Sequence, residues 1–138
     1  MTARIQLYTD GGARGNPGPA AIGILICDTA GKFLRERHEL IGPTTNNVAE
    51  YTAVIRGLEL AAELRAEEVH AFMDSQLVAN QLGGTFRVKT PHILDLYKRV
   101  QVLLPRFKKT IFTHVPRTHE KIRYVDKLVN LALDRAGH

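Results

Sequence analysis

The spacing of apolar residues changes once in the first half of the chain, and this change most restricts the fold. Before it, residues 4–10 and 32–40 alternate between apolar and polar side chains, and residues 20–27 form a short apolar run. From about residue 45 to 65 the apolar side chains fall three and four apart, which is typical of one helix face. We therefore expect a three-stranded meander followed by a long helix that Thr44 or Thr45 can cap.

The second half of the chain continues the mixed pattern. We expect a strand at 68–73, a helix at 75–82 ended by two glycines, a helix from Pro91 to Leu104, a strand at 108–115 and a helix at 122–135. A sheet with helices on its faces would bury the apolar side of every element. Because no repeat, linker or low-complexity stretch interrupts the chain, we expect one domain over residues 1–138.

Basic residues are concentrated in the second half of the sequence. Residues 1–69 carry seven Lys and Arg against nine Asp and Glu, whereas residues 70–138 carry twelve against five. A basic surface favours a polyanion such as nucleic acid, because binding neutralises phosphates and releases counterions. The net charge of +5 alone is equally compatible with an ordinary basic globular protein.

Several other properties narrow the class of protein. No apolar run approaches the roughly 20 residues that span a bilayer, and the strand pattern begins without room for a cleaved signal, so we expect a cytoplasmic protein without membrane contact. Cys27 is the only cysteine, which excludes an internal disulfide and favours a small buried side chain. No exposed apolar stripe requires a partner, so we expect a monomer.

Four acidic residues stand where a core sequence would not place a charge. Asp10 and Asp74 each end an apolar strand, while Glu50 and Asp126 interrupt apolar helix patterns. Carboxylates at strand ends and beside buried helix faces can converge at one edge of a sheet, where they would bind hard cations such as Mg²⁺. This pattern indicates metal-assisted chemistry on a phosphate. Each acid also has an ordinary explanation, as an Asp-Gly turn, a capping residue or a solvated helix residue.

Four motifs, read in order, connect these acids to a known family. They are YTDGGARGNPGPAAIG, TTNNVAEYTAVIRGLE, MDSQLVANQLGG and HVPR followed by VDKLVN. Together they resemble the type 1 ribonuclease H family over nearly the whole chain. The resemblance implies an α/β ribonuclease H-like fold, with a five-stranded mixed sheet whose first three strands are antiparallel, flanked by helices. It also implies an endoribonuclease, a phosphodiester hydrolase that cuts the RNA strand of RNA–DNA hybrids with two Mg²⁺ or Mn²⁺ ions and leaves 5′-phosphate and 3′-hydroxyl ends.

The resemblance assigns roles to individual residues. Asp10, Glu50, Asp74 and Asp126 would be both the metal ligands and the catalytic residues. Asp134 could compete with Asp126, but the pattern of Asp followed by Leu and Asn favours Asp126. His119 would be the mobile loop histidine that assists product departure.

Further residues would contact the substrate. These are Gly11, Gly12, Arg14, Asn16, Thr45, Asn46, Gln76 and Arg117. Longer family members carry a lysine-rich helical protrusion, in whose place this chain has the short segment GGTFRVKTP. We therefore expect a short form that lacks the basic protrusion and binds the hybrid with fewer basic side chains.

Two other functions fit the same fold. A module that binds hybrid or double-stranded RNA without cutting it should have lost at least one acid, whereas all four are present here. A related nuclease acting on DNA junctions or transposon ends would not need contacts to 2′-hydroxyls, which are what distinguishes RNA from DNA.

Overall fold

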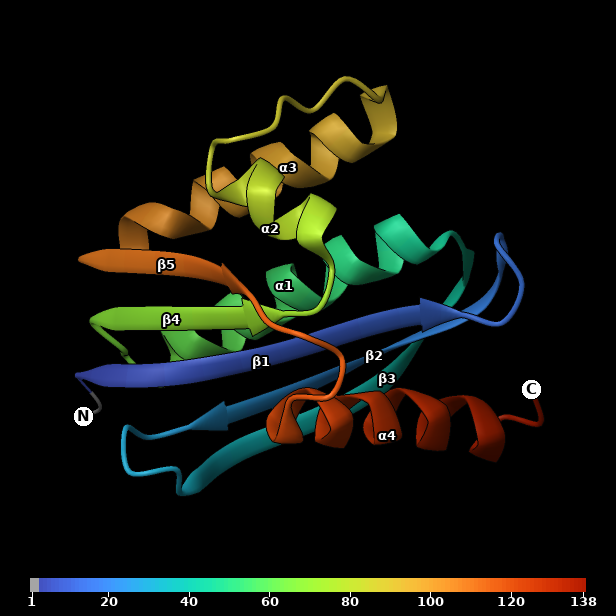
Figure 1. The fold of residues 1–138 in the computed structure, drawn as a ribbon, viewed down its shortest axis with the longest axis horizontal. Helices are drawn as coiled ribbons and strands as arrows, with labels where there is room; N and C mark the ends of the chain where they lie inside the picture. The colour runs from blue at the N-terminus through green and yellow to red at the C-terminus, as the bar shows by residue number, and fades with distance from the viewer. Residues whose placement is uncertain (1–2) are drawn as a thin grey trace.

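The computed structural model describes residues 3–138, whose five strands form one mixed sheet in the order β3-β2-β1-β4-β5 (Figure 1). The strands are β1 (Arg4–Ala13), β2 (Gly18–Cys27), β3 (Phe33–Thr44), β4 (Glu68–Met73) and β5 (Lys109–His114). The β1–β2 and β2–β3 pairs are antiparallel, while β4 runs parallel to β1 and β5 parallel to β4. The predicted fold class is therefore confirmed.

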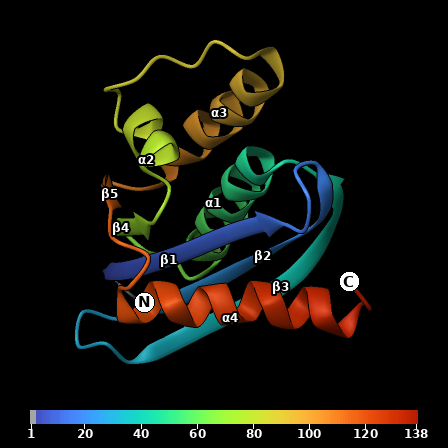
Figure 2. The same cartoon turned by 45° about the vertical axis from the view of Figure 1, so that its right-hand side comes forward.

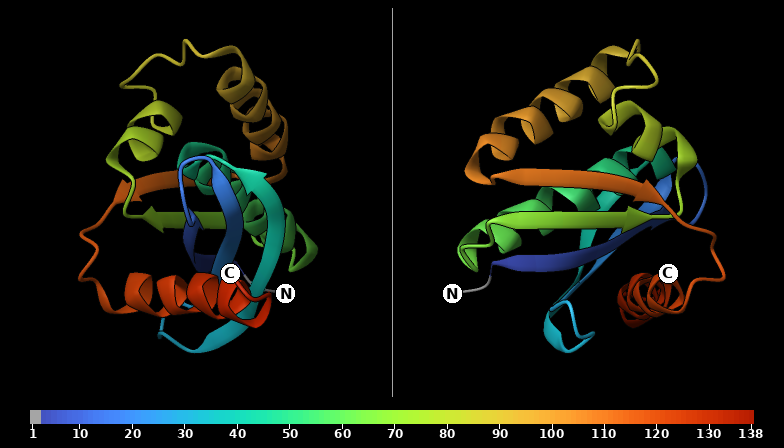
Figure 3. Two further views of the ribbon diagram at one scale, coloured as in Figure 1. Left: turned by 90° about the vertical axis from the view of Figure 1, so that its right-hand side faces the viewer. Right: turned by 60° about the vertical axis from the view of Figure 1, so that its left-hand side comes forward.

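Helices cover both faces of this sheet. They are α1 (Asn46–Glu63), α2 (Gln76–Leu82), α3 (Pro91–Leu103) followed by the 3₁₀ turn Leu104–Arg106, and α4 (Glu120–Arg135). The helix α4 lies across the antiparallel strands, on the face opposite to α1 (Figures 2 and 3). No helix lies between α2 and α3, where residues 83–90 connect them, so the predicted absence of a helical protrusion is confirmed.

The alternation of side chains along β2 explains why that strand reads as a continuous apolar run. Ile22, Ile24 and Ile26 pack into the large core that includes α1, whereas Leu25 and Cys27 pack against α4. Because both faces of β2 are covered, no polar residue is needed on either side. Cys27 is a fully buried free cysteine, as predicted.

The strand β1 extends further than its apolar pattern indicated. We expected a strand at 4–10, but Gly11 and Gly12 continue it by pairing with Ile22 and Ala21 of β2. Pairing with β4, in contrast, ends at Tyr8. The prediction was short because glycine has low strand propensity, and here the antiparallel partner overrides it.

The ends of the other strands and helices agree with the predicted ends to within a few residues. Thr45 caps α1, since its hydroxyl accepts a hydrogen bond of 3.3 Å from the Val48 amide. The strand β3 continues to Thr44, and α4 begins at Glu120, slightly before the predicted start. Among the described residues, none of the helices combines the length and the apolarity that crossing a membrane requires.

Candidate active site

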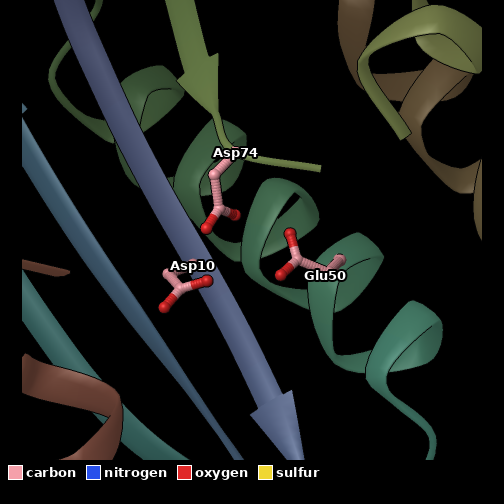
Figure 4. Close-up of side chains that lie close together, drawn as sticks. All are labelled: Asp10, Glu50 and Asp74. Atoms are coloured by element: carbon pink, nitrogen blue, oxygen red, sulfur yellow. The ribbon is translucent and has the colours of Figure 1, made fainter. Parts of the chain in front are cut away.

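Three of the four predicted acids converge where β1, β4 and α1 meet. Asp10 lies within β1, Glu50 lies in α1, and Asp74 follows the last residue of β4. One carboxylate oxygen of each lies within 4.8 Å of those of the other two (Figure 4). Parallel pairing of β1 and β4 brings their carboxyl ends to the same edge of the sheet, which is where open sheets place their sites.

Gly11 allows α1 to approach β1 closely. A Cβ at this position would lie 2.3 Å from both the carbonyl carbon and the oxygen of Ala49, so only glycine fits. The Gly11 amide also donates a hydrogen bond of 3.4 Å to Oε1 of Glu50. The backbone of β1 therefore sets both the position of α1 and the orientation of the Glu50 carboxylate.

Burial and mutual repulsion disturb the ionisation of these acids. Asp10 is 7% exposed and Glu50 is 9% exposed. Burial, followed by the charges of Glu50 and Asp74, raises the pKa of Asp10 well above its ordinary value. Burial and the charge of Asp74 likewise raise the pKa of Glu50. A divalent cation would offset this repulsion, and a set of carboxylate oxygens is the donor set that Mg²⁺ and Mn²⁺ prefer.

Asp126 approaches the same site from the opposite face of the sheet. It is exposed on α4, and its carboxyl group lies near enough to Asp10 to raise the Asp10 pKa further. Its own oxygen Oδ2 accepts a hydrogen bond of 3.4 Å from Nδ2 of Asn130, one turn further along the helix. The competing Asp134 instead forms an ion pair of 2.7 Å with Arg14. Of these two aspartates, Asp126 is therefore the one that accompanies the three converging acids.

The acids open into a cleft of about 360 Å³. Its lining includes all four acids and five of the predicted substrate contacts, which are Gly11, Gly12, Arg14, Asn46 and Arg117. Arg117 is 88% exposed, and its Nε lies 3.6 Å from Oδ2 of Asp74. It therefore places an exposed positive charge in the lining of an acidic cleft.

Six lining residues were not predicted from the sequence. They are Ala13, Asn47, Ser75, Val129, Asn130 and Leu133. For two of these the sequence held a signal, because Ser75 directly follows an acid and Asn130 lies four residues after one. The others depend on how α1 and α4 pack against the end of β1.

Three predicted substrate residues lie outside the cleft lining. The side chain of Asn16 accepts a hydrogen bond of 2.9 Å from the Asn46 amide, and the Asn46 side chain accepts one of 2.9 Å from the Ala13 amide. Thr45 caps α1, and Gln76 is the exposed first residue of α2. Asn16 and Thr45 thus help to hold α1 in place, while no hydrogen bond of the Gln76 side chain is seen among the described residues.

His119 is not brought to the cleft either. It precedes α4, where its Nδ1 accepts a hydrogen bond of 3.1 Å from the Lys121 amide. The centre of its ring lies 5.6 Å from that of Tyr8 and 6.4 Å from that of Phe72. The structure thus gives His119 a capping and packing role, and a part in product departure stays a prediction.

Comparisons with known sequences indicate which proteins this chain resembles. A family model described as reverse transcriptase-like matches residues 8–132. The bifunctional protein Rv2228c of Mycobacterium tuberculosis is 41% identical over 97% of this chain, which spans only 36% of that relative. A ribonuclease H of Hydrogenovibrio crunogenus is 33% identical, and the match covers 94% of this chain and 95% of the relative.

Solved structures show the same similarity. The RNase H1 of Halobacterium salinarum is 40% identical with a TM-score of 0.92, and the match covers 96% of this chain and 99% of that one. LC11-RNase H1, solved in complex with an RNA/DNA hybrid, is 42% identical with a TM-score of 0.88, covering 97% and 99%. With its fold, its converging acids and these relatives, the chain belongs to the ribonuclease H family.

Proposed function

We propose that this chain hydrolyses the RNA strand of RNA–DNA hybrids with two bound Mg²⁺ or Mn²⁺ ions. The observation that carries the proposal is the convergence of Asp10, Glu50 and Asp74 in one cleft, accompanied by Asp126. The relative solved with an RNA/DNA hybrid supports the choice of substrate.

The four carboxylates would hold the ions in this proposal. Bound divalent ions would activate a water on one side of the scissile phosphate and stabilise the leaving oxygen on the other. Asp10 is the natural shared ligand, because it contacts Asp126 on one side and belongs to the buried group on the other. The products would carry 5′-phosphate and 3′-hydroxyl ends, and no side chain has to act as a covalent nucleophile.

Residues around the acids would recognise the hybrid. Gly11 and Gly12 line the cleft with main-chain atoms alone, and Asn46 and Arg117 offer polar contacts on the cleft wall. Selecting RNA for cleavage requires contacts to 2′-hydroxyl groups, which both donate and accept hydrogen bonds. Arg117 beside Asp74 would meet the phosphates of the entering strand.

One labelled hybrid, incubated with and without Mg²⁺ beside matched DNA and RNA duplexes, tests this function. We expect cuts only in the RNA strand of the hybrid, only with metal, and with 5′-phosphate ends. Cutting of the all-DNA duplex would instead indicate a DNA nuclease of the same fold. Tight hybrid binding without any cut would favour the non-catalytic binding module, against which the presence of all four acids argues.

Three broader expectations stay proposals alongside this one. We infer that residues 1–138 form a single ribonuclease H domain, that it acts as a monomer, and that it works in the cytoplasm. Sedimentation and fractionation of the protein from its own cells would test the last two.

A further inference from the structure

We propose that Arg14 is a positioning residue for Asp126 rather than a substrate contact, an inference that rests on the proposed function. The guanidinium of Arg14 joins two side chains of α4. Its Nη1 lies 2.7 Å from Oδ1 of Asp134, and its Nη2 donates a hydrogen bond of 3.3 Å to Oδ1 of Asn130. The Nδ2 of Asn130 in turn donates to Asp126. These contacts form a continuous chain from Asp134 to the fourth acid.

The spacing along α4 makes this chain of contacts geometrically regular. Asp126, Asn130 and Asp134 are four residues apart, so they lie along one side of the helix. All three are exposed, and an exposed aspartate on a helix is otherwise free to rotate away from the site. The neighbouring Val129 and Leu133 are buried in a small cluster against β2, which holds this part of α4 in place.

The chemistry of Arg14 selects one orientation of the Asn130 amide. Arginine can only donate hydrogen bonds, so the amide must turn its oxygen toward Arg14 and its NH₂ group toward Asp126. Without the guanidinium, only the long 3.4 Å hydrogen bond to Asp126 would hold the exposed amide, which could then rotate toward solvent. Arg14 therefore acts on Asp126 by fixing the direction of the residue between them.

The backbone of Arg14 is itself well held. Its amide donates a hydrogen bond of 2.8 Å to the carbonyl of Pro19, across the hairpin between β1 and β2. A Cβ at residue 18 would lie 2.1 Å from the Arg14 carbonyl oxygen, so Gly18 permits this tight closure. The guanidinium thus projects toward α4 from a fixed base.

The pairing with Asp134 also argues against a phosphate contact. The Arg14 side chain is only 34% exposed, and its charge is already matched by a carboxylate. Arg117, 88% exposed, is the more available cation of the cleft lining. Asp134 distinguishes a positioning role of Arg14 from a phosphate contact, because its negative charge would weaken any phosphate contact made by Arg14.

Steady-state kinetics on a hybrid, with Arg14→Gln, Asp134→Asn and the double variant, tests the assignment. We expect each single variant to lower kcat about tenfold with an unchanged KM, as for residues that orient metal ligands. The double variant should be no worse than the poorer single variant, because both changes break the same chain of contacts. Arg56→Gln is the matched control, since it removes exposed ion pairs to Glu39 of β3 and Glu59 of α1, all outside the cleft lining.

Two further measurements do not depend on turnover. Titration with MnCl₂ by calorimetry should show about tenfold weaker binding in Arg14→Gln and Asp134→Asn, but not in Arg56→Gln. The side-chain NH₂ resonances of Asn130, followed by nitrogen-15 NMR, should move toward the shifts of a solvated amide in both variants. Circular dichroism establishes that each variant is folded.

The results that overturn the inference are distinct from those that overturn the function. A raised KM in Arg14→Gln with unchanged kcat and Mn²⁺ affinity, together with a lowered KM in Asp134→Asn, would make Arg14 a phosphate ligand. If the unaltered protein binds Mn²⁺ but cuts no hybrid, the proposed function fails while the calorimetric and NMR results still decide the role of Arg14. An Asn130 resonance that is unchanged in both variants would reject the positioning role in either case.

Discussion

The three acids on β1, on α1 and directly after β4 are held in place by different means from the fourth acid on α4. Asp10 and Glu50 are almost fully buried, and main-chain packing of Gly11 against Ala49 sets the distance between their two elements. Asp126 is exposed, and a row of side-chain hydrogen bonds holds it instead. The first arrangement cannot loosen without disrupting the fold, whereas the second can be weakened one side chain at a time.

The largest expected difference between the two regions is in catalysis. We expect Asp10→Asn to lower hybrid cleavage more than about 1,000-fold, because a shared ligand contributes both charge and geometry. Asp126→Asn should cost only about 10- to 100-fold, since a peripheral ligand can be partly replaced by water. Single-turnover rates at saturating Mg²⁺ measure both, and equal losses in the two variants would remove the distinction between the regions.

The next largest effect concerns the packing beneath the buried acids. We expect Gly11→Ala to lower the free energy of unfolding by about 3 kcal/mol or more, because the added methyl group overlaps the Ala49 backbone. Gly12→Ala is the matched control, since its Cβ would meet only Cγ1 of Val129 at 3.7 Å, an ordinary contact. Urea unfolding of both variants measures the difference. A well-folded Gly11→Ala protein of normal stability would contradict the view that the backbone fixes these acids.

The stability of the metal-free protein should also separate buried from exposed acids. The raised pKa of Asp10 means that the folded protein keeps a proton that the unfolded chain has already lost. The free energy of unfolding therefore falls as pH rises above the ordinary carboxyl pKa of 3.8. We expect Asp10→Asn to remove much of this fall and to stabilise the protein by about 1–3 kcal/mol at pH 7.

Thermal unfolding in EDTA across a pH series measures this effect. Asp126→Asn should leave most of the pH dependence in place, because burial and the charges of Glu50 and Asp74 are the larger causes of the raised Asp10 pKa. Added Mg²⁺ should stabilise the unaltered protein more than Asp10→Asn, since binding to the folded state alone raises stability. A lower melting temperature for Asp10→Asn in EDTA would show that repulsion among the acids does not strain the fold.

The smallest expected effect is at His119, which lies at the start of the helix that carries Asp126. Loss of its cap to the Lys121 amide should lower the free energy of unfolding by about 1 kcal/mol in His119→Ala. We expect turnover to stay within about twofold, because the ring lies outside the cleft lining. A pH–rate profile of the variant checks this, and a large fall in turnover would support the predicted role in product departure.

Much of the architecture could be predicted because apolar periodicity reports directly on burial. The strand at 68–73 agrees with the structure for this reason. Capping and glycine chemistry, rather than periodicity, predicted the Thr45 cap of α1 and the end of α2 at Gly83. The extension of β1 through Gly11 and Gly12 could not be predicted, since it depends on pairing with β2 rather than on local propensity.

The convergence of the acids could be predicted, because two of them end apolar strands in the sequence and the order of the motifs places all four at one edge of the sheet. The environment of Arg14 was not, because a surface arginine near a phosphate site and one paired with a helix aspartate look alike in sequence. Only the packing of α4 against β2 places Asn130 and Asp134 beside it.

The early end of the β1–β4 pairing at Tyr8 has a consequence for how the site tolerates changes in chain length. Beyond that point β1 is paired only with β2, and Glu50 reaches the Gly11 amide where a neighbouring strand would otherwise bind. Asp10 follows Tyr8 onto the α4 face, while Gly11 lies on the α1 face. One residue inserted or deleted in this stretch would exchange those two faces, sending the carboxylate toward α1 and the glycine toward α4. The stretch between Tyr8 and Gly11 therefore cannot change in length without turning Asp10 away from the site.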